Sequence, residues 1–451
     1  MSAVLHRSLE APPVLAVEGD GCYLIDAQGR RYLDASGGAA VSSLGHSHPD
    51  VIAAIQRQVA KLSYAHTSFF TNEPAERLAA TLIERAPAGF GAGRVAFVGS
   101  GSEAMEVALK LARQHFVERG ETRRSHFIAR RMSYHGNTLG ALSVGGHFQR
   151  RAMYAPMLMP TTHVSPCHPY RFRNPGESDV AYGRRVADEL DAEILRVGSD
   201  RVAAFVAEPV VGATLGCVPA VEGYFARIRE ICDRHGVLFI ADEVMCGMGR
   251  TGTMFAIDHE RVRPDIITLG KGLGAGYMPI GATMASERVV AALQKGSGAL
   301  ANGHTYMSHA VACAGAVAVL DCMQREQLLD NVNVQGARLR SALEQRFGAH
   351  PNVGDIRGRG LFQALELVED RDTRQPFARA LRIAEGIRTT ALRNGLVCYP
   401  SSGTADGERG DHVLLAPPYI VDDRHIDEIV DKLDTALGQV LEEARCVAQV
   451  Q

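Results

Sequence analysis

Two side chains able to do chemistry follow strand-like apolar runs in this sequence. Asp242 follows the run 237–241, and Lys271 follows the run 265–269 inside the glycine-rich stretch "GKGLGAG". A carboxylate at the carboxyl end of a strand is where α/β sheets place ligand-binding groups. Solvent exposure is the simplest interpretation of Lys271, because a buried ammonium group is costly. The flanking glycines nevertheless allow a ligand to approach closely, and a desolvated lysine amine is nucleophilic.

A third stretch, "VAFVGSGSEAMEVALKLAR" at 95–113, reads as strand, glycine turn and helix. Unpaired N–H groups and the positive end of the helix dipole make such a turn a phosphate cradle. Residues 99–104 fit the dinucleotide fingerprint. However, 247–252 fit GxGxxG as well, and the next predicted strand leads into Arg130 rather than an acid. The Walker pattern is absent. For the loop alone, a purely structural glycine turn is an equally good interpretation.

The order of these three features favours one cofactor. Each feature alone favours a structural role. Pyridoxal phosphate (PLP) requires a phosphate anchor, a carboxylate that keeps the pyridine nitrogen protonated, and an amine that forms a Schiff base. The loop at 99–104, Asp242 and Lys271 supply these parts in turn.

The chain also resembles the class III aminotransferases of the fold type I PLP enzymes, over essentially its whole length. The segments that carry the resemblance are "LGHSHP" at 44–49, "GSGSEA" at 99–104, "SYHG" at 133–136, "AEPV" at 207–210, "DEVMCGMGRTG" at 242–252, "GKG" at 270–272 and "HTY" at 304–306. The resemblance implies that an amino group moves by a ping-pong mechanism from a primary amine or ω-amino acid to a 2-keto acid. It also implies a homodimer or larger assembly with shared active sites.

The resemblance further implies a role for each matching position. The implied cofactor-binding residues are Gly101, Ser102, Tyr134, Glu208, Asp242, Val244, Lys271 and Thr305. Asp242 would pair with the ring nitrogen and Lys271 would form the Schiff base. Glu208 is expected near the ring hydroxyl, and Thr305 is expected at the phosphate of the neighbouring subunit. Gly101 and Ser102 would bind the phosphate, while Tyr134 and Val244 would contact the two ring faces.

Three departures from patterns within the family concern the substrate, two of them relative to the ornithine-type members. Ala213 stands where those relatives carry a switch glutamate, and Met245 stands where many have glutamine. Both features resemble the amine and ω-amino acid:pyruvate transaminases and favour pyruvate as acceptor. Ala39 stands where those enzymes usually place an aromatic residue, so a roomier pocket is expected.

Three further residues are candidates for substrate contact. Arg409, directly before "GDH" at 410–412, is the candidate carboxylate-binding arginine, because its planar fork suits that group. Phe69 and Phe70 are candidate pocket residues, although plain packing explains aromatic side chains there equally well. His135 is as readily explained as a structural histidine, and Arg250 as a residue that orders its glycine turn.

Alternating apolar and amphipathic runs predict the elements that position these residues. Strands are expected at 95–98, 126–129, 202–206, 237–241 and 265–269. Helices are expected at 49–62, 74–83, 102–119, 184–197 and 221–235, followed by one long helical stretch at about 306–347. This rhythm is typical of a parallel sheet covered by helices. We expect an α/β fold of type I with an N-terminal segment (1–64) that contributes to a small domain, a large PLP-binding domain (65–330) and a C-terminal small α+β domain (331–451).

The bulk composition excludes several function classes. A net charge of −3 gives no electrostatic case for nucleic acid or an anionic membrane. No apolar run approaches the roughly 20 residues of a membrane span. The nine cysteines form no Cys-x-x-Cys pair and no Cys/His cluster, so we expect reduced thiols, no metal site and a cytoplasmic protein.

Rival functions remain open at this point. A racemase or epimerase, a decarboxylase or a lyase could use the same cofactor on the same fold. An NADP-dependent dehydrogenase that uses the 99–104 loop is a second rival, and a non-catalytic PLP binder is a third.

Overall fold

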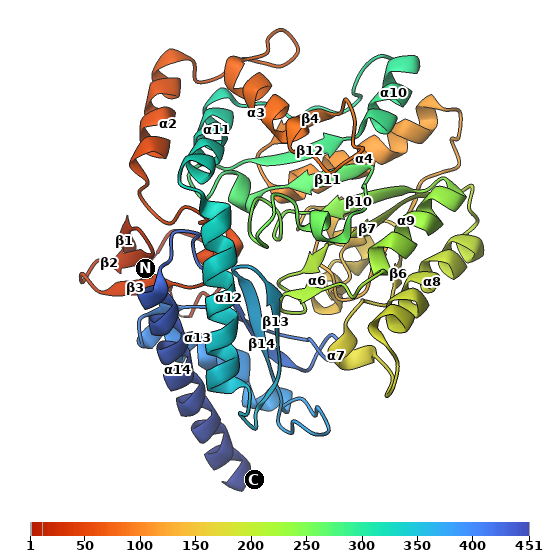
Figure 1. Cartoon of the computed structure of the whole chain (residues 1–451). Coiled ribbons are helices and arrows are strands. Elements are labelled where there is room, and N and C mark those ends of the chain that lie inside the picture. Colours follow the sequence, from red (N-terminus) through yellow and green to blue (C-terminus); the bar gives the residue numbers. More distant parts are fainter. Residues whose placement is uncertain (1, 11, 451) are drawn as a thin grey trace.

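The computed structural model describes residues 2–10 and 12–450, and a seven-stranded sheet forms its centre (Figure 1). The strands lie in the order β4 (Arg94–Val98), β12 (Gly281–Ala285), β11 (Ile266–Leu269), β10 (Leu238–Asp242), β7 (Val202–Ala207), β5 (His126–Arg130) and β6 (Thr161–Val164). Only β12 runs antiparallel to its neighbours in this sheet. The predicted mostly parallel sheet is therefore confirmed, and all five predicted strands lie within one residue of their observed ends.

Helices cover both faces of this sheet. Phe205 and Phe239 pack on one face with helices α8 (Asp179–Val197) and α9 (Tyr224–His235). Val206 and Ile240, one position further along the same strands, pack on the other face with α4 (Gly101–Glu118), α5 (Leu139–Val144) and α10 (Glu287–Lys295). Because successive side chains point to opposite faces, a strand covered on both faces must be apolar throughout. This burial explains the unbroken apolar runs of the sequence.

The long helical stretch predicted at 306–347 is two helices. They are α11 (Ala310–Arg325) and α12 (Leu328–Phe347), and α11 packs against α2 (Pro49–Lys61) and α3 (Glu73–Glu84). Gln327 between them has a φ of 51°. A left-handed residue cannot continue a right-handed helix, so the predicted helical stretch is interrupted at this residue.

A second group of strands joins the two ends of the chain. One sheet has the order β13 (Val353–Arg359), β14 (Phe362–Leu367), β17 (Asp411–Leu415) and β16 (Tyr399–Ser402). Another contains β1 (Ala16–Asp20), β2 (Tyr23–Asp26), β3 (Arg31–Asp34) and β15 (Leu396–Val397). Since β3 pairs with β15, N-terminal and C-terminal segments share one sheet, next to α12, α13 (Ile383–Arg393) and α14 (Asp423–Val450), as Figure 1 shows.

The remaining elements are short. They are α1 (Gly37–Ala40), α6 (Phe148–Ala152), α7 (Pro169–Phe172), β8 (Val210–Val211), β9 (Val218–Pro219) and the 3₁₀ turns η1 (Ala155–Met157), η2 (Ala256–Glu260), η3 (Lys271–Leu273) and η4 (Arg379–Leu381). Within the described ranges, no helix is long and apolar enough to cross a bilayer. The nine cysteines are free thiols, and only Cys446 is exposed.

Candidate active site

The residues singled out from the sequence meet at one edge of the central sheet. Strands β4, β5, β7, β10 and β11 run in the same direction, so their carboxyl ends lie together. Asp242 ends β10, Glu208 follows β7 and Lys271 follows β11. The carboxylates of Asp242 and Glu208 are close enough to act electrostatically on the Lys271 amine. The edge of the sheet therefore gathers a lysine and two buried carboxyl groups.

Asp242 is buried and held by three donors. Its Oδ1 accepts hydrogen bonds from the Val244 N–H at 3.1 Å and the Thr268 hydroxyl at 3.0 Å. Its Oδ2 lies 2.6 Å from Nδ1 of His135, whose side chain is fully buried. Oδ1 thereby uses both lone pairs, while Oδ2 keeps one for a ligand donor. His135 is thus a structural residue with a specific task, which is to orient the Asp242 carboxylate.

The glycine loop forms a narrow cradle at the start of α4. The Gly99 N–H donates to Glu103 Oε2 at 2.7 Å, and the Glu103 N–H donates to the Ser100 hydroxyl at 3.2 Å. A Cβ added to Gly101 would lie 2.6 Å from Cγ1 of Val244, so a side chain there would fill the cradle. The Ser102 hydroxyl accepts from the Asn137 N–H at 3.0 Å. The N–H groups of Gly101 and Ser102, in the first turn of α4, have no recorded partner among the described residues, so they and the helix dipole are open to an anion.

A second glycine, Gly136 in the segment after β5, is also required for the shape of the cradle. Its φ of 132° is a conformation that other residues rarely adopt. A Cβ at this position would also lie 2.7 Å from the Ser102 hydroxyl oxygen. The stretch after β5 therefore packs directly on the first turn of α4.

Lys271 is half-buried and begins η3 with a φ of 44°. Burial lowers the pKa of its amine to about 8, although Asp242 and Glu208 oppose this shift by stabilising the ammonium form. An ordinary lysine titrates near 10.4. At pH 7 about a tenth of the Lys271 amine is therefore unprotonated and nucleophilic, far more than for an ordinary lysine.

This lowered pKa has a measurable consequence in the cofactor-free protein. The rate of Lys271 acetylation by acetic anhydride should rise with pH with a midpoint near 8, as followed by peptide mass spectrometry, with exposed Lys295 as internal reference. In Asp242→Asn the midpoint should fall below 8. The Asp242 carboxylate stabilises the charged form of the amine, so its removal lowers the pKa of Lys271 further. A midpoint above 10 in the wild type would contradict the buried environment of Lys271.

Glu208 carries an unpaired buried oxygen. Its side chain is 5% exposed, and its Oε2 has no hydrogen-bond partner. Burial raises the pKa of this carboxyl to about 7. The Arg130 guanidinium donates to the backbone carbonyl of Glu208 and so holds the segment in place. Buried polar atoms are nearly always hydrogen-bonded, so Oε2 is suited to a polar atom of a ligand.

The two expected ring-stacking residues lie on the loops after β5 and β10. Tyr134 is half-buried, and the guanidinium carbon of Arg150 lies 4.7 Å from its ring centroid. Val244 is also half-buried, and its side chain lies next to the backbone of Gly101 in the cradle. Their stacking on a cofactor ring stays a prediction.

The substrate candidates divide into two groups. Ala39, Ala213 and Met245 meet in one apolar cluster, so the structure brings these three together. Phe69 and Phe70, on the loop between α2 and α3, are 79% and 66% exposed. No contact of these two phenylalanines with the Lys271 region is recorded among the described residues.

Arg409 and Thr305 lie outside the cluster around Lys271. The Arg409 Nε donates to Asp406 Oδ2 at 2.8 Å in the loop 403–410. Thr305 is exposed, and its carbonyl accepts from the Tyr64 hydroxyl at 2.8 Å. With Gly99, Thr305 lines a cavity of about 600 Å³ at the outer side of the glycine loop.

Arg250 has the ordering role expected from its glycine turn. Its buried guanidinium donates to the carbonyl oxygens of Leu361 at 3.2 Å and Pro417 at 2.5 Å. It also lies 4.6 Å from the ring centroid of Tyr419. These contacts, both made by Nη1, tie the turn to the C-terminal segment, while Nε and Nη2 of Arg250 are buried without a recorded hydrogen-bond partner among the described residues.

A lysine, two carboxyl groups and an anion cradle at one edge of an α/β sheet form an arrangement suited to lysine-centred chemistry. The family model described as Aminotransferase class-III matches residues 4–437. The chain therefore belongs to the class III aminotransferases, and its fold is that of the type I transaminases.

Individual relatives agree with this assignment. An uncharacterised aminotransferase of Schizosaccharomyces pombe is 46% identical over 96% of this chain and 94% of its own length. A solved (S)-enantioselective omega-transaminase from Thermomicrobium roseum is 32% identical, with a TM-score of 0.89 over 96% of this chain and 94% of its own. A PMP-bound aminotransferase from Vibrio fluvialis, also 32% identical, has a TM-score of 0.88 with the same coverage.

Proposed function

We propose that this protein is a PLP-dependent transaminase that moves an amino group from a primary amine or ω-amino acid to pyruvate. The observation that carries the proposal is the convergence of Lys271, Asp242 and Glu208 at one sheet edge, beside the glycine cradle. The solved relatives that are named omega-transaminases or PMP-bound support it.

The residues present fit this cofactor. The cradle at Gly101 and Ser102 would hold its phosphate, and Asp242 would accept a hydrogen bond from its ring nitrogen. The unpaired Oε2 of Glu208 would face the ring hydroxyl. When bound, PLP supplies an electron sink that stabilises negative charge on the carbon bearing the amino group.

The chain's own residues perform the remaining tasks. Asp242, whose direction is fixed by His135 and Thr268, would keep the proton on the ring nitrogen through its negative charge. Lys271 would hold the cofactor through Nζ and, once free, would move a proton to or from the substrate carbon with the same atom. The lowered pKa of Lys271 suits this task, because a general base works best with a pKa near the operating pH.

The acceptor specificity is proposed from the pocket residues. Ala213, packed with Ala39 and Met245, supplies no charge to pair with an arginine against the second carboxylate of 2-oxoglutarate. Arg409 is half-exposed, and its partner Asp406 lies in the same glycine-containing loop. An arginine held by a surface ion pair, which is worth at most about 1 kcal/mol, can exchange that partner for a substrate carboxylate.

The test compares pyruvate and 2-oxoglutarate as acceptors with one amine donor, in wild type and in Arg409→Ala. The wild type should prefer pyruvate in kcat/KM. The variant should lose about tenfold or more for pyruvate, because a charge-assisted hydrogen bond is worth about 1.5–3 kcal/mol. A preference for 2-oxoglutarate would refute the argument from Ala213. Unchanged pyruvate kinetics in the variant would remove Arg409 from the site. Amino-group transfer to neither keto acid would refute the transaminase itself.

We also propose that the active site is completed across a homodimer. Thr305 is exposed beside the outer face of the glycine loop, where a second copy could approach. Activity should therefore coincide with the dimer in sedimentation velocity, and dilution into monomer should release cofactor. A fully active monomer that retains its cofactor would contradict a shared site.

A further inference from the structure

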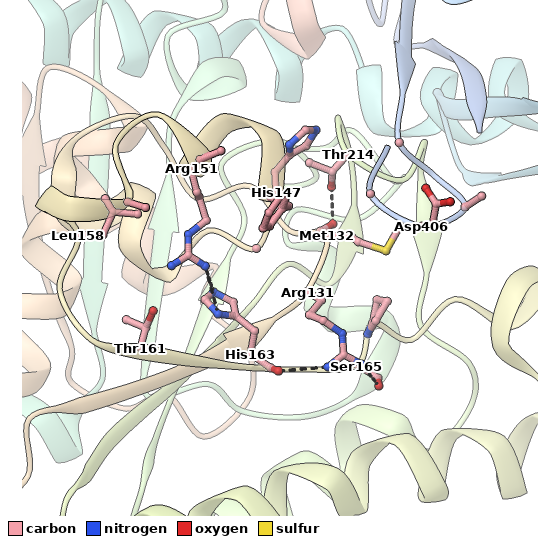
Figure 2. Close-up of a pocket in the computed structure, with 18 of the residues that line it drawn as sticks. Arg131, Met132, His147, Arg151, Leu158, Thr161, His163, Ser165, Thr214 and Asp406 are labelled. Atoms are coloured by element: carbon pink, nitrogen blue, oxygen red, sulfur yellow. Dashed lines mark hydrogen bonds between the residues drawn. The ribbon is translucent and has the colours of Figure 1, made fainter. Parts of the chain in front are cut away.

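A cavity of about 820 Å³ lies outside the cluster around Lys271 (Figure 2). It is bounded by the ends of β5 and β6, the helix α6 and the loop 403–407. None of Lys271, Asp242 and Glu208 lines it. Thr214, next to the pocket residue Ala213, does line it and donates its hydroxyl to the Met132 carbonyl at 2.6 Å. The cavity therefore borders the candidate active site through this segment.

Most of the cavity wall is apolar. The apolar side chains that line it are Met132, Phe148, Ala152, Ala155, Leu158, Met159, Pro160, Pro166, Phe172 and Ala405. Volumes of roughly 300–1,000 Å³ with apolar walls and a few polar groups are typical of small-molecule sites. By size and lining, the cavity can hold a molecule with an apolar body.

Two guanidinium groups stand in this wall, and their recorded partners are neutral. Arg131 donates to the Ser165 hydroxyl at 2.5 Å and to the His163 carbonyl at 3.4 Å. Arg151 Nη1 lies 3.2 Å from both ring nitrogens of His163. Figure 2 shows both arginines on either side of His163. No ion pair of Arg131 or Arg151 is recorded in the part of the chain that the structure describes.

The imidazoles in the cavity do not add or remove charge near pH 7. Burial and the neighbouring Arg151 lower the pKa of His163 to about 4, and its Nε2 lies 3.1 Å from the Val144 carbonyl. Nε2 therefore donates to that carbonyl, and Nδ1 accepts from Arg151. Burial and Arg150 lower the pKa of His147 to about 4. The lining carboxylate Asp406 is already paired with Arg409.

Arg131 and Arg151 thus stand beside an apolar wall, and neither has a recorded ion pair among the described residues. Burial lowers the pKa of the half-buried Arg151, so its charge is partly desolvated, whereas Arg131 is exposed. A counter-charge would offset the cost at Arg151 and could also reach Arg131. We propose that this cavity is a binding site for an organic anion whose carboxylate or phosphate head pairs with Arg131 and Arg151 while its apolar body packs on the wall. The anion is either a separate small molecule or the acidic end of a long substrate that reaches past Thr214.

The binding test uses sodium octanoate as the probe and 1-octanol as an uncharged probe of equal length. Calorimetry on the cofactor-loaded full chain, in a buffer without phosphate or carboxylate, compares wild type with Arg131→Gln/Arg151→Gln. We expect the octanoate Kd to rise about tenfold or more in this variant, because two charge-assisted contacts are lost. The Kd of octanol should not change. Equal octanoate affinity in both proteins, or no binding to the wild type up to about 10 mM, would overturn the proposal.

A matched control removes two positive charges elsewhere. Arg77→Gln/Arg123→Gln changes two exposed arginines, paired with Asp321 and Asp200. This control should bind octanoate as the wild type does. A loss of affinity equal to that of the cavity variant would mean that overall charge, not the cavity, holds the probe. Should the double cavity variant unfold, the single change Arg131→Gln at an exposed position should still raise the octanoate Kd, and no change there would count against the proposal.

A kinetic arm separates the two sources of the anion, and only this arm rests on the proposed transaminase function. If the acidic end of a substrate enters the cavity, Arg131→Gln/Arg151→Gln should raise KM for 8-aminooctanoate and leave that for 1-octylamine unchanged. If the anion is a separate molecule, both KM values should stay unchanged while the calorimetric loss persists. Absence of any transamination would refute the proposed function without affecting the calorimetric result.

Discussion

Lys271→Ala is expected to abolish amino transfer while the protein still binds its cofactor non-covalently. In the proposed mechanism, turnover needs the Lys271 Nζ both to hold the cofactor and to move a proton, whereas the cradle at Gly101 and the carboxylate of Asp242 remain in the variant. Borohydride reduction of the wild type followed by peptide mapping should label Lys271. Absorbance and gel filtration should show cofactor that stays with the variant but is removed by denaturation.

The matched control for this experiment is Lys295→Ala. Lys295 is exposed near the end of α10, so its removal changes one positive charge far from the chemistry. The control should keep both borohydride labelling and full activity. Labelling of a lysine other than Lys271 in the wild type would overturn the assignment of the nucleophile.

Asp242→Asn should lower kcat by at least about 10²-fold, comparable to the loss of a principal electrostatic stabiliser. Asparagine has nearly the same shape but lacks the charge that keeps the ring nitrogen protonated. Steady-state kinetics with a single amine donor should show the loss in kcat more than in KM. Near-normal kcat would mean that Asp242 does not interact with the ring nitrogen of the cofactor.

His135→Phe provides a graded comparison with the Asp242 substitution. It removes one of three donors to Asp242 but keeps the carboxylate, so its loss in kcat should be smaller, about tenfold. If His135 only filled space, its replacement would lower the stability of the protein and leave the pH profile of kcat unchanged. A shifted profile in His135→Phe would identify His135 as a positioning residue.

The predicted strands and the residues at their ends agree with the structure for one physical reason. Strands buried on both faces must be apolar throughout, and this produces an unmistakable run in the sequence. Since parallel strands share an edge, Asp242 and Lys271 had to lie near one another once β10 and β11 were recognised. The interruption at Gln327 left no such signal, because only Glu326 and Gln327 separate α11 from α12 and neither is a glycine or proline.

Side-chain contacts between distant segments were beyond prediction. His135 reaches Asp242 across 107 positions of the chain, and only the packed sheet shows which of its neighbours it faces. The cavity beside α6 arises from loop 403–407 lying near Thr214, a juxtaposition that no local pattern encodes. The ion pair of Arg409 could have been predicted. Asp406 lies three positions before Arg409, a spacing at which opposite charges often pair.

Close backbone packing sets the distance between the anion cradle and the lysine. β12 separates β4 from β11 in the sheet, but the loops after β4 and β11 meet, since a Cβ added to Gly270 would lie 3.3 Å from the Gly101 Cα. Any side chain at position 270 would therefore press on the cradle and move it away from the neighbouring Lys271 amine. Gly281 is constrained in the same way, because a Cβ there would collide with the Ser100 carbonyl oxygen and push β12 away from the glycine loop.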